Sequence, residues 1–159
     1  MISTHDPHTL IHQALQSLEI SLEHSTACIE ETNYWLKHDG LDDPQLLDLT
    51  HLPFVTIDNE NSRDLDQAVH IDRTDQGYRV MYALADAAYY ISPGSALFDE
   101  ALKRGTSYYT PLLSAAMLPT ALSEGLISLN PNVERRSLVF DISLDNQAAV
   151  TTVQLKEQK

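Results

Sequence analysis

The sequence predicts an α+β fold in which a helical segment precedes a mixed, mostly antiparallel sheet with short helices. Three observations predict this class. Residues 7–39 contain no glycine and carry apolar residues at helical spacing. β-branched and aromatic runs begin only after Pro53. Two later stretches, 68–85 and 137–155, each have the pattern of a strand, a polar turn and a second strand.

The first 52 residues are expected to form the helical segment. Asp6 is a good N-cap and Pro7 a good first helical residue. The pattern predicts either one long helix or two shorter ones broken near residues 24–26, with Gly40 as the stop signal. Residues 44–52 are expected to add one more helical turn.

The second part, residues 53–159, contains all of the expected strands. In order, we expect a strand at 54–57, a hairpin of strands 68–72 and 78–85, a helix at 95–103 that Gly105 ends, an extended segment at 107–111, a helix at 120–129, and a hairpin of strands 137–144 and 148–155.

The charge is strongly acidic, with 10 Lys plus Arg against 23 Asp plus Glu and a net charge of −13. Taken alone, this balance argues against a nucleic-acid-binding protein, because phosphate contacts come from Lys and Arg. It fits a metal-binding or protein-binding domain better. Residues 1–50 hold nine acidic residues and one basic residue, so any RNA contact is expected in the later part of the chain.

Nothing in the sequence suggests a membrane segment or a secretory signal. No apolar run approaches the roughly 20 residues that a membrane-spanning helix needs, and the N-terminus lacks a basic and an apolar region. Cys28 is the single cysteine, so an internal disulfide is impossible and a cytoplasmic setting is expected. The thiol itself is expected to be buried and unreactive.

The most informative stretch carries three aspartates, Asp58, Asp64 and Asp66, followed by the neutral Gln67. Carboxylates this close repel one another unless they share a cation, and hard oxygen donors suit Mg²⁺ or Mn²⁺. A calcium-binding EF-hand does not fit, since its sixth and twelfth positions would be Arg63 and Val69. A solvated acidic turn stays open as an alternative.

The sequence does not support two other kinds of site. His5, His8 and His12 have a spacing compatible with zinc, but the sequence offers no matching second pair of ligands. A phosphate-binding glycine loop is excluded, because no Gly-x-Gly occurs.

The words around the aspartates resemble the opening motif of the RNB catalytic domain of ribonuclease II and ribonuclease R. The matching segments follow one another at family-like separations over residues 54–145: Thr56-Ile57-Asp58, Ser62-Arg63-Asp64-Leu65-Asp66, Tyr82-Ala83-Leu84-Ala85-Asp86, Pro93-Gly94-Ser95, Arg104-Gly105-Thr106-Ser107-Tyr108-Tyr109, Met117-Leu118-Pro119 and Leu122-Ser123-Glu124-Gly125-Leu126-Ile127-Ser128-Leu129-Asn130-Pro131.

This resemblance implies part of a metal-dependent exoribonuclease, which uses Mg²⁺ or possibly Mn²⁺ to degrade single-stranded RNA from the 3′ end to nucleoside 5′-monophosphates. It implies that Asp58, Asp64 and Asp66 are acidic-centre residues and metal ligands. Tyr109 falls where the family has an aromatic that stacks on a base, with a core tyrosine as the alternative. Arg104 could contact phosphate, although an ion pair with Asp99 or Glu100 is an equal alternative.

The sequence departs from the family pattern at two points. Gln67 stands where the family usually has a fourth aspartate; its amide oxygen can reach a metal but carries no charge. The chain also ends before the later glutamate and arginine of the family's active site and lacks its cold-shock and S1 domains. These 159 residues alone are therefore expected to be inactive, and a non-catalytic binding or regulatory module with the same fold remains the alternative function.

Overall fold

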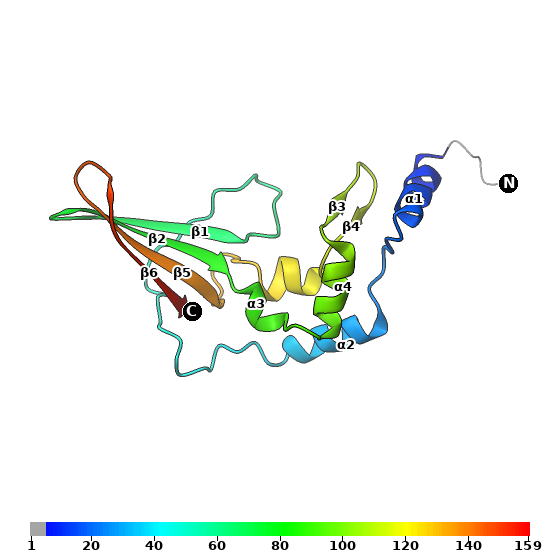
Figure 1. The fold of residues 1–159 in the computed structure, drawn as a ribbon, viewed down its shortest axis with the longest axis horizontal. Coiled ribbons are helices and arrows are strands. Elements are labelled where there is room, and N and C mark those ends of the chain that lie inside the picture. The colour runs from blue at the N-terminus through cyan, green and yellow to red at the C-terminus, as the bar shows by residue number, and fades with distance from the viewer. Residues whose placement is uncertain (1–5) are drawn as a thin grey trace. The chain divides into compact units, whose positions relative to one another are not determined.

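The structure is a computed structural model, and it describes residues 6–159 of the chain. It contains two compact units (Figure 1). The first unit comprises the described residues up to Lys37 together with Ile91–Ala121, and the second comprises His38–Tyr90 with Leu122–Lys159. Both units are discontinuous in sequence, so they divide the chain differently from the expected segments 1–52 and 53–159. No helix within residues 6–159 is both long enough and apolar enough to cross a bilayer.

The first unit begins with two helices, α1 (Pro7–Ser17) and α2 (Thr26–Trp35). The Asp6 carboxylate accepts a hydrogen bond from the Thr9 backbone N–H at 3.3 Å and so caps α1, as predicted. Ser25 caps α2 by accepting from the Cys28 backbone N–H. The interpretation as two shorter helices is confirmed, although α2 ends at Trp35, well before Gly40.

The rest of the first unit consists of α4 (Ala96–Arg104) and a small hairpin of β3 (Tyr108–Tyr109) and β4 (Ser114–Ala115). α4 starts at the Ser95 N-cap and ends at Gly105, whose φ of +71° is the left-handed conformation that favours glycine. Leu15, Ile20 and Ala115 form a small buried cluster in this unit.

The second unit is built on an antiparallel sheet in the order β1-β2-β5-β6. Its strands are β1 (Gln67–Thr74), β2 (Gly77–Ala85), β5 (Ser137–Leu144) and β6 (Val150–Gln158). Both hairpins predicted from the alternating pattern are therefore confirmed. One face of the sheet holds a buried cluster of Ala68, Met81, Ala83 and Val139, against which Leu49, Leu52, Phe54 and Leu129 pack.

Two short helices and a buried arginine complete the second unit. The helices are α3 (Ala87–Tyr90), which the sequence pattern did not predict, and the π-helix η1 (Ala121–Leu126), whose first residue ends the first unit. Arg136 lies 3.6 Å above the Tyr89 ring and donates to the Gly40 carbonyl, Asp43 and Glu157. These contacts hold the loop after residue 38 on the sheet.

Two expected elements are wrong in this region. Residues 44–52 form turns instead of a helical turn, because Asp43 and Asp48 accept hydrogen bonds from the backbone N–H two residues later and so compete with a helix. The helix expected over 120–129 is the shorter η1, where Ile127 N–H donates to the Leu122 carbonyl in the i to i−5 pattern.

Candidate functional site

The three aspartates lie in one loop of the second unit, directly before β1. Val55 and Val69 close the loop by an antiparallel bridge, with N–H to carbonyl distances of 3.0 and 2.8 Å. The strand expected at 54–57 is therefore reduced to one bridging residue, Val55, which brings the two ends of the loop together. The backbone that carries the three aspartates therefore starts and ends at this bridge.

The second half of this loop is anchored by a residue far along the chain. The buried Ser128 hydroxyl accepts a hydrogen bond from the Leu65 N–H at 2.9 Å and donates to the Arg63 carbonyl at 2.8 Å. The Leu65 carbonyl also accepts from the Leu129 N–H at 2.7 Å. The backbone on both sides of Asp64 is thus held in place from the segment that follows η1.

Ser128 is itself held by its neighbours. Its carbonyl accepts a hydrogen bond from Arg135 Nε at 3.1 Å, and Asn130 donates to the Glu124 carbonyl at 2.9 Å. The sequence pattern assigned no role to Ser128 or Asn130, although both stand in the segment Leu122–Pro131 that carries part of the family resemblance. The family resemblance of that segment was the one feature of the sequence that could have pointed to these two residues.

The side chains of Asp58, Asp64, Asp66 and Gln67 are all exposed. Among residues 6–159, the one group of three or more His, Cys, Asp or Glu donors whose ligand atoms lie within 4.8 Å of one another is His24, Cys28 and Glu100. The three aspartates are not drawn that close, which agrees with the repulsion between carboxylates. Drawing them together requires a cation or bound protons.

The donor set still fits a hard divalent cation. Three carboxylates on a loop that is closed at its base and anchored at Ser128 offer the oxygen ligands that Mg²⁺ and Mn²⁺ take. Gln67, the first residue of β1, accepts a hydrogen bond from the Tyr82 hydroxyl through its amide oxygen. One lone pair of that oxygen is thereby used within the sheet, which leaves Gln67 a weaker donor than the three aspartates.

Tyr109 lies in the first unit, on β3, and its side chain is 71% exposed. The alternative of a core tyrosine is therefore wrong. β3 and β4 are joined by a tight turn in which Thr110 and Leu113 exchange backbone and hydroxyl hydrogen bonds of 2.5 to 2.9 Å. The hairpin presents the Tyr109 ring on a defined backbone.

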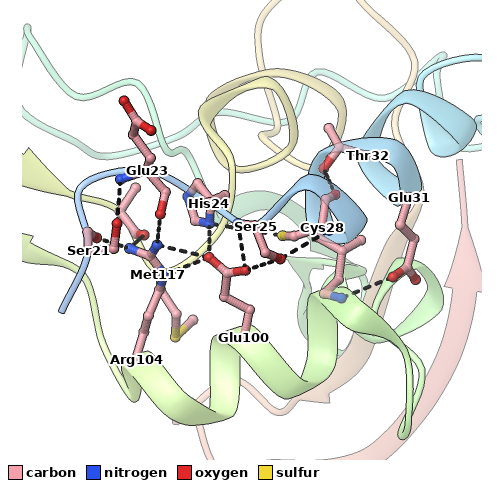
Figure 2. A network of polar contacts seen from close by, with 12 residues as sticks. Ser21, Glu23, His24, Ser25, Cys28, Glu31, Thr32, Glu100, Arg104 and Met117 are labelled. Atoms are coloured by element: carbon pink, nitrogen blue, oxygen red, sulfur yellow. Dashed lines mark hydrogen bonds and ion pairs between the residues drawn. The ribbon is translucent and has the colours of Figure 1, made fainter. Parts of the chain in front are cut away.

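Arg104 is buried, and the structure favours the ion-pair alternative over a phosphate contact. Its guanidinium donates to Glu100 through Nε at 3.2 Å and Nη2 at 2.8 Å (Figure 2). Its other hydrogen bonds go to the carbonyls of Ser21, Glu23 and Ala116. All five N–H donors of this side chain are occupied, so none is available for RNA in this conformation.

The zinc site considered for His5, His8 and His12 has no support among the residues that the structure describes. His8 and His12 lie on α1, and His5 lies outside the described residues. Within residues 6–159, neither His8 nor His12 belongs to a group of three close donors.

The chain is similar in sequence and structure to known ribonucleases. The family model for the RNB domain matches residues 46–157. Ribonuclease R of Buchnera aphidicola subsp. Schizaphis graminum is 39% identical over 149 residues, which cover 86% of this chain and 20% of that protein. Ribonuclease R of Escherichia coli K12 is 43% identical over 106 residues, covering 66% of this chain and 13% of that protein.

A solved structure agrees with this similarity. RNase R of Mycoplasma genitalium, in a complex with ribose-methylated single-stranded RNA, superimposes with a TM-score of 0.85 at 31% identity. The match covers 97% of this chain and 24% of that one. The chain spans a quarter or less of the length of these relatives. The match over residues 46–157, which include the aspartate loop and its Ser128 anchor, shows that the chain belongs to the RNB domain family.

Proposed function

We propose that this chain carries the carboxylate-bearing part of a divalent-metal-dependent exoribonuclease site, which acts on single-stranded RNA from the 3′ end and releases nucleoside 5′-monophosphates. One observation carries the proposal: three exposed aspartates share a loop that is closed by the Val55–Val69 bridge and anchored by Ser128, in a chain of the RNB family. The relatives are named ribonuclease R, and one solved relative is bound to single-stranded RNA.

Asp58, Asp64 and Asp66 would hold Mg²⁺ or Mn²⁺. When bound, such an ion neutralises phosphate charge and lowers the pKa of a bound water. With the ion bound, the three aspartates would fix its place in the loop and so the place at which a phosphate could bind. Without a cation their own charges repel phosphate, as the net charge of −13 does for the whole chain. RNA binding is therefore expected to depend on divalent metal.

Tyr109 supplies a sequence-independent contact in this proposal. Its exposed ring can stack on any base, and such stacking contributes roughly 1–3 kcal/mol per base. A surface that tolerates every base suits an enzyme that degrades RNA one nucleotide at a time. The cytoplasmic setting expected from the single cysteine belongs to the same proposal.

A metal titration followed by thermal unfolding tests the proposal directly. Mg²⁺ and Mn²⁺ are expected to raise the melting temperature of the wild-type chain. Asp58→Asn and Asp66→Asn are expected to abolish that rise. Asp75→Asn is a matched control, because Asp75 is an exposed aspartate in the turn between β1 and β2. A wild-type chain whose unfolding is unchanged by either metal contradicts the proposed site.

A second candidate function is a non-catalytic module that binds partners or RNA without cleaving it. Gln67 favours it, because this residue is uncharged and its amide oxygen is engaged by Tyr82. This alternative predicts no 5′-monophosphate from labelled RNA at high protein concentration, and no gain in Gln67→Asp. Nucleotide release by the wild-type chain with Mg²⁺ or Mn²⁺, lost in Asp66→Asn, eliminates the alternative.

A further inference from the structure

A cluster of three potential metal ligands lies in the first unit, in a different unit from the aspartate loop. It consists of His24, which precedes the N-cap of α2, Cys28 in the first turn of α2, and Glu100 on α4 (Figure 2). His24 Nδ1 lies 2.9 Å from Glu100 Oε1 and 3.9 Å from Cys28 Sγ, and all three ligand atoms lie within 4.8 Å of one another.

We propose that His24, Cys28 and Glu100 form a Zn²⁺ site with one position left for water. Imidazole nitrogen, thiolate and carboxylate are the donors that zinc accepts, whereas Mg²⁺ requires oxygen ligands. Zinc bonds of about 2.0–2.3 Å place tetrahedral ligands roughly 3.3–3.8 Å apart. The observed spacings of 2.9 and 3.9 Å lie on both sides of this range, so small side-chain movements suffice.

Hydrogen bonds from neighbouring residues orient the carboxylate of Glu100, as is usual for a carboxylate that binds zinc. Ser25 donates to Oε2 through its hydroxyl at 2.6 Å and its N–H at 3.0 Å. Oε1 lies against His24 Nδ1 and also accepts from Arg104, so binding of an ion at Oε1 requires the Arg104 guanidinium to give up part of this contact. Although burial opposes ionisation, the hydrogen bonds from Ser25 and Arg104 lower the pKa of Glu100 to about 2. The carboxylate is therefore charged at neutral pH, and the hydrogen bonds from Ser25 and Arg104 fix its orientation.

The other two ligands reach their binding forms by moving protons. Burial and the Arg104 charge lower the pKa of His24, so its ring is neutral near pH 7. Without metal, Nδ1 carries the ring proton and donates to Glu100, and this proton moves to Nε2 when Nδ1 binds the ion. Burial raises the pKa of the Cys28 thiol to about 11, so the thiol keeps its proton until zinc displaces it. Binding thus releases about one proton per ion, from Cys28.

A zinc ion can reach this cluster from a neighbouring cavity, and acidic groups near the cluster offset the positive charge of Arg104. A cavity of about 620 Å³ opens beside it, lined in part by His24, Glu100 and Lys103, and this cavity has room for the water ligand. The positive charge of Arg104 opposes a cation. The thiolate formed at Cys28 cancels one of the two zinc charges, and the acidic residues Glu19 and Glu23 line the same cavity.

Cobalt, which reports thiolate coordination through an ultraviolet charge-transfer band, provides the test. The metal-free chain is titrated with Co²⁺ or Zn²⁺ in excess Mg²⁺, which occupies the aspartate loop. We expect one Co²⁺ per chain, a thiolate band, and competition by Zn²⁺. Cys28→Ser is expected to abolish the band, and His24→Gln or Glu100→Gln to weaken Zn²⁺ binding at least about 100-fold.

The double variant His8→Gln/His12→Gln is the matched control, because it removes two histidines four residues apart on α1 without touching the cluster. It is expected to bind like the wild type. X-ray absorption on the zinc-loaded wild type supplies a second measurement that needs no variant, with one sulfur among the ligands expected. No thiolate band in the wild type, a band that survives Cys28→Ser, or a zinc shell without sulfur overturns the proposal.

Discussion

Replacement of Ser128 by alanine tests whether the aspartate loop depends on its anchor. The change removes the hydroxyl that accepts from the Leu65 N–H and donates to the Arg63 carbonyl. Each lost hydrogen bond costs about 0.5–1.5 kcal/mol, and more where water cannot replace it. Because the variant loses two such hydrogen bonds, we expect the free energy of unfolding to fall by about 1–3 kcal/mol.

The measurement is a urea unfolding curve of Ser128→Ala against the wild type, followed by fluorescence and circular dichroism. Ser123→Ala is the matched control, since Ser123 is a half-buried serine on η1. The control is expected to change stability by less than about 0.5 kcal/mol.

Metal affinity supplies the second readout for the same variant. If Ser128 fixes the backbone next to Asp64, the folded Ser128→Ala chain binds Mn²⁺ more weakly than the wild type at a temperature where both are folded. A loss of stability below about 0.5 kcal/mol together with unchanged Mn²⁺ affinity would refute the reasoning. Restored affinity in Ser128→Thr, which keeps a hydroxyl, supports it.

Three other predictions follow from single contacts. Tyr109→Ala is expected to weaken single-stranded RNA binding roughly 5- to 100-fold in a filter-binding assay with Mn²⁺, without altering the melting temperature, since the ring is exposed. Arg104→Met leaves the carboxylate of Glu100, whose side chain is 14% exposed, without its buried cation and is expected to destabilise the chain by up to about 3–5 kcal/mol in urea unfolding; an unchanged curve contradicts the ion-pair role. Hydrogen bonds from Arg79 lower the pKa of Asp141 below 3.8, so its contribution of roughly 0.5–1 kcal/mol is present above that pH and is lost as the pH falls further. Acid titration of unfolding in Asp141→Asn is expected to lack that component.

Local patterns predicted the parts of the fold that local physics decides. Alternating apolar residues around short polar turns specified both hairpins, and Asp6 and Gly105 marked helix ends because capping depends on a few neighbouring residues. The turns at residues 44–52 escaped prediction. There, Leu47 and Leu49 pair with the last residues of the chain, and this pairing is set by tertiary structure.

The site divides in the same way. The candidate aspartates and the candidate stacking residue Tyr109 could be singled out from the sequence because their motifs are local, and their roles stay predictions. The role of Ser128 could not be predicted, because its partners Leu65 and Arg63 lie 63 and 65 residues away along the chain. For Arg104 the sequence offered the ion pair with Glu100 only as one of two alternatives, because the carbonyls of Ser21 and Glu23 that it also binds lie 83 and 81 residues away. Spacing alone cannot tell an arginine that binds carbonyls within the fold from one that faces phosphate.

The separation in sequence between the aspartate loop and Ser128 also affects folding during translation. The loop leaves the ribosome before η1, β5 and β6. The strand β2 pairs with β5, so that Met81 lies opposite Asp141, a residue that is synthesised much later. Contacts this far apart in sequence form late and slow folding. A nascent chain that has reached residue 120 therefore carries all three aspartates of the loop but lacks both Ser128, which anchors the loop, and β5, which pairs with β2. The order of translation therefore delays a defined conformation of the aspartate loop until the second half of the sheet has been synthesised.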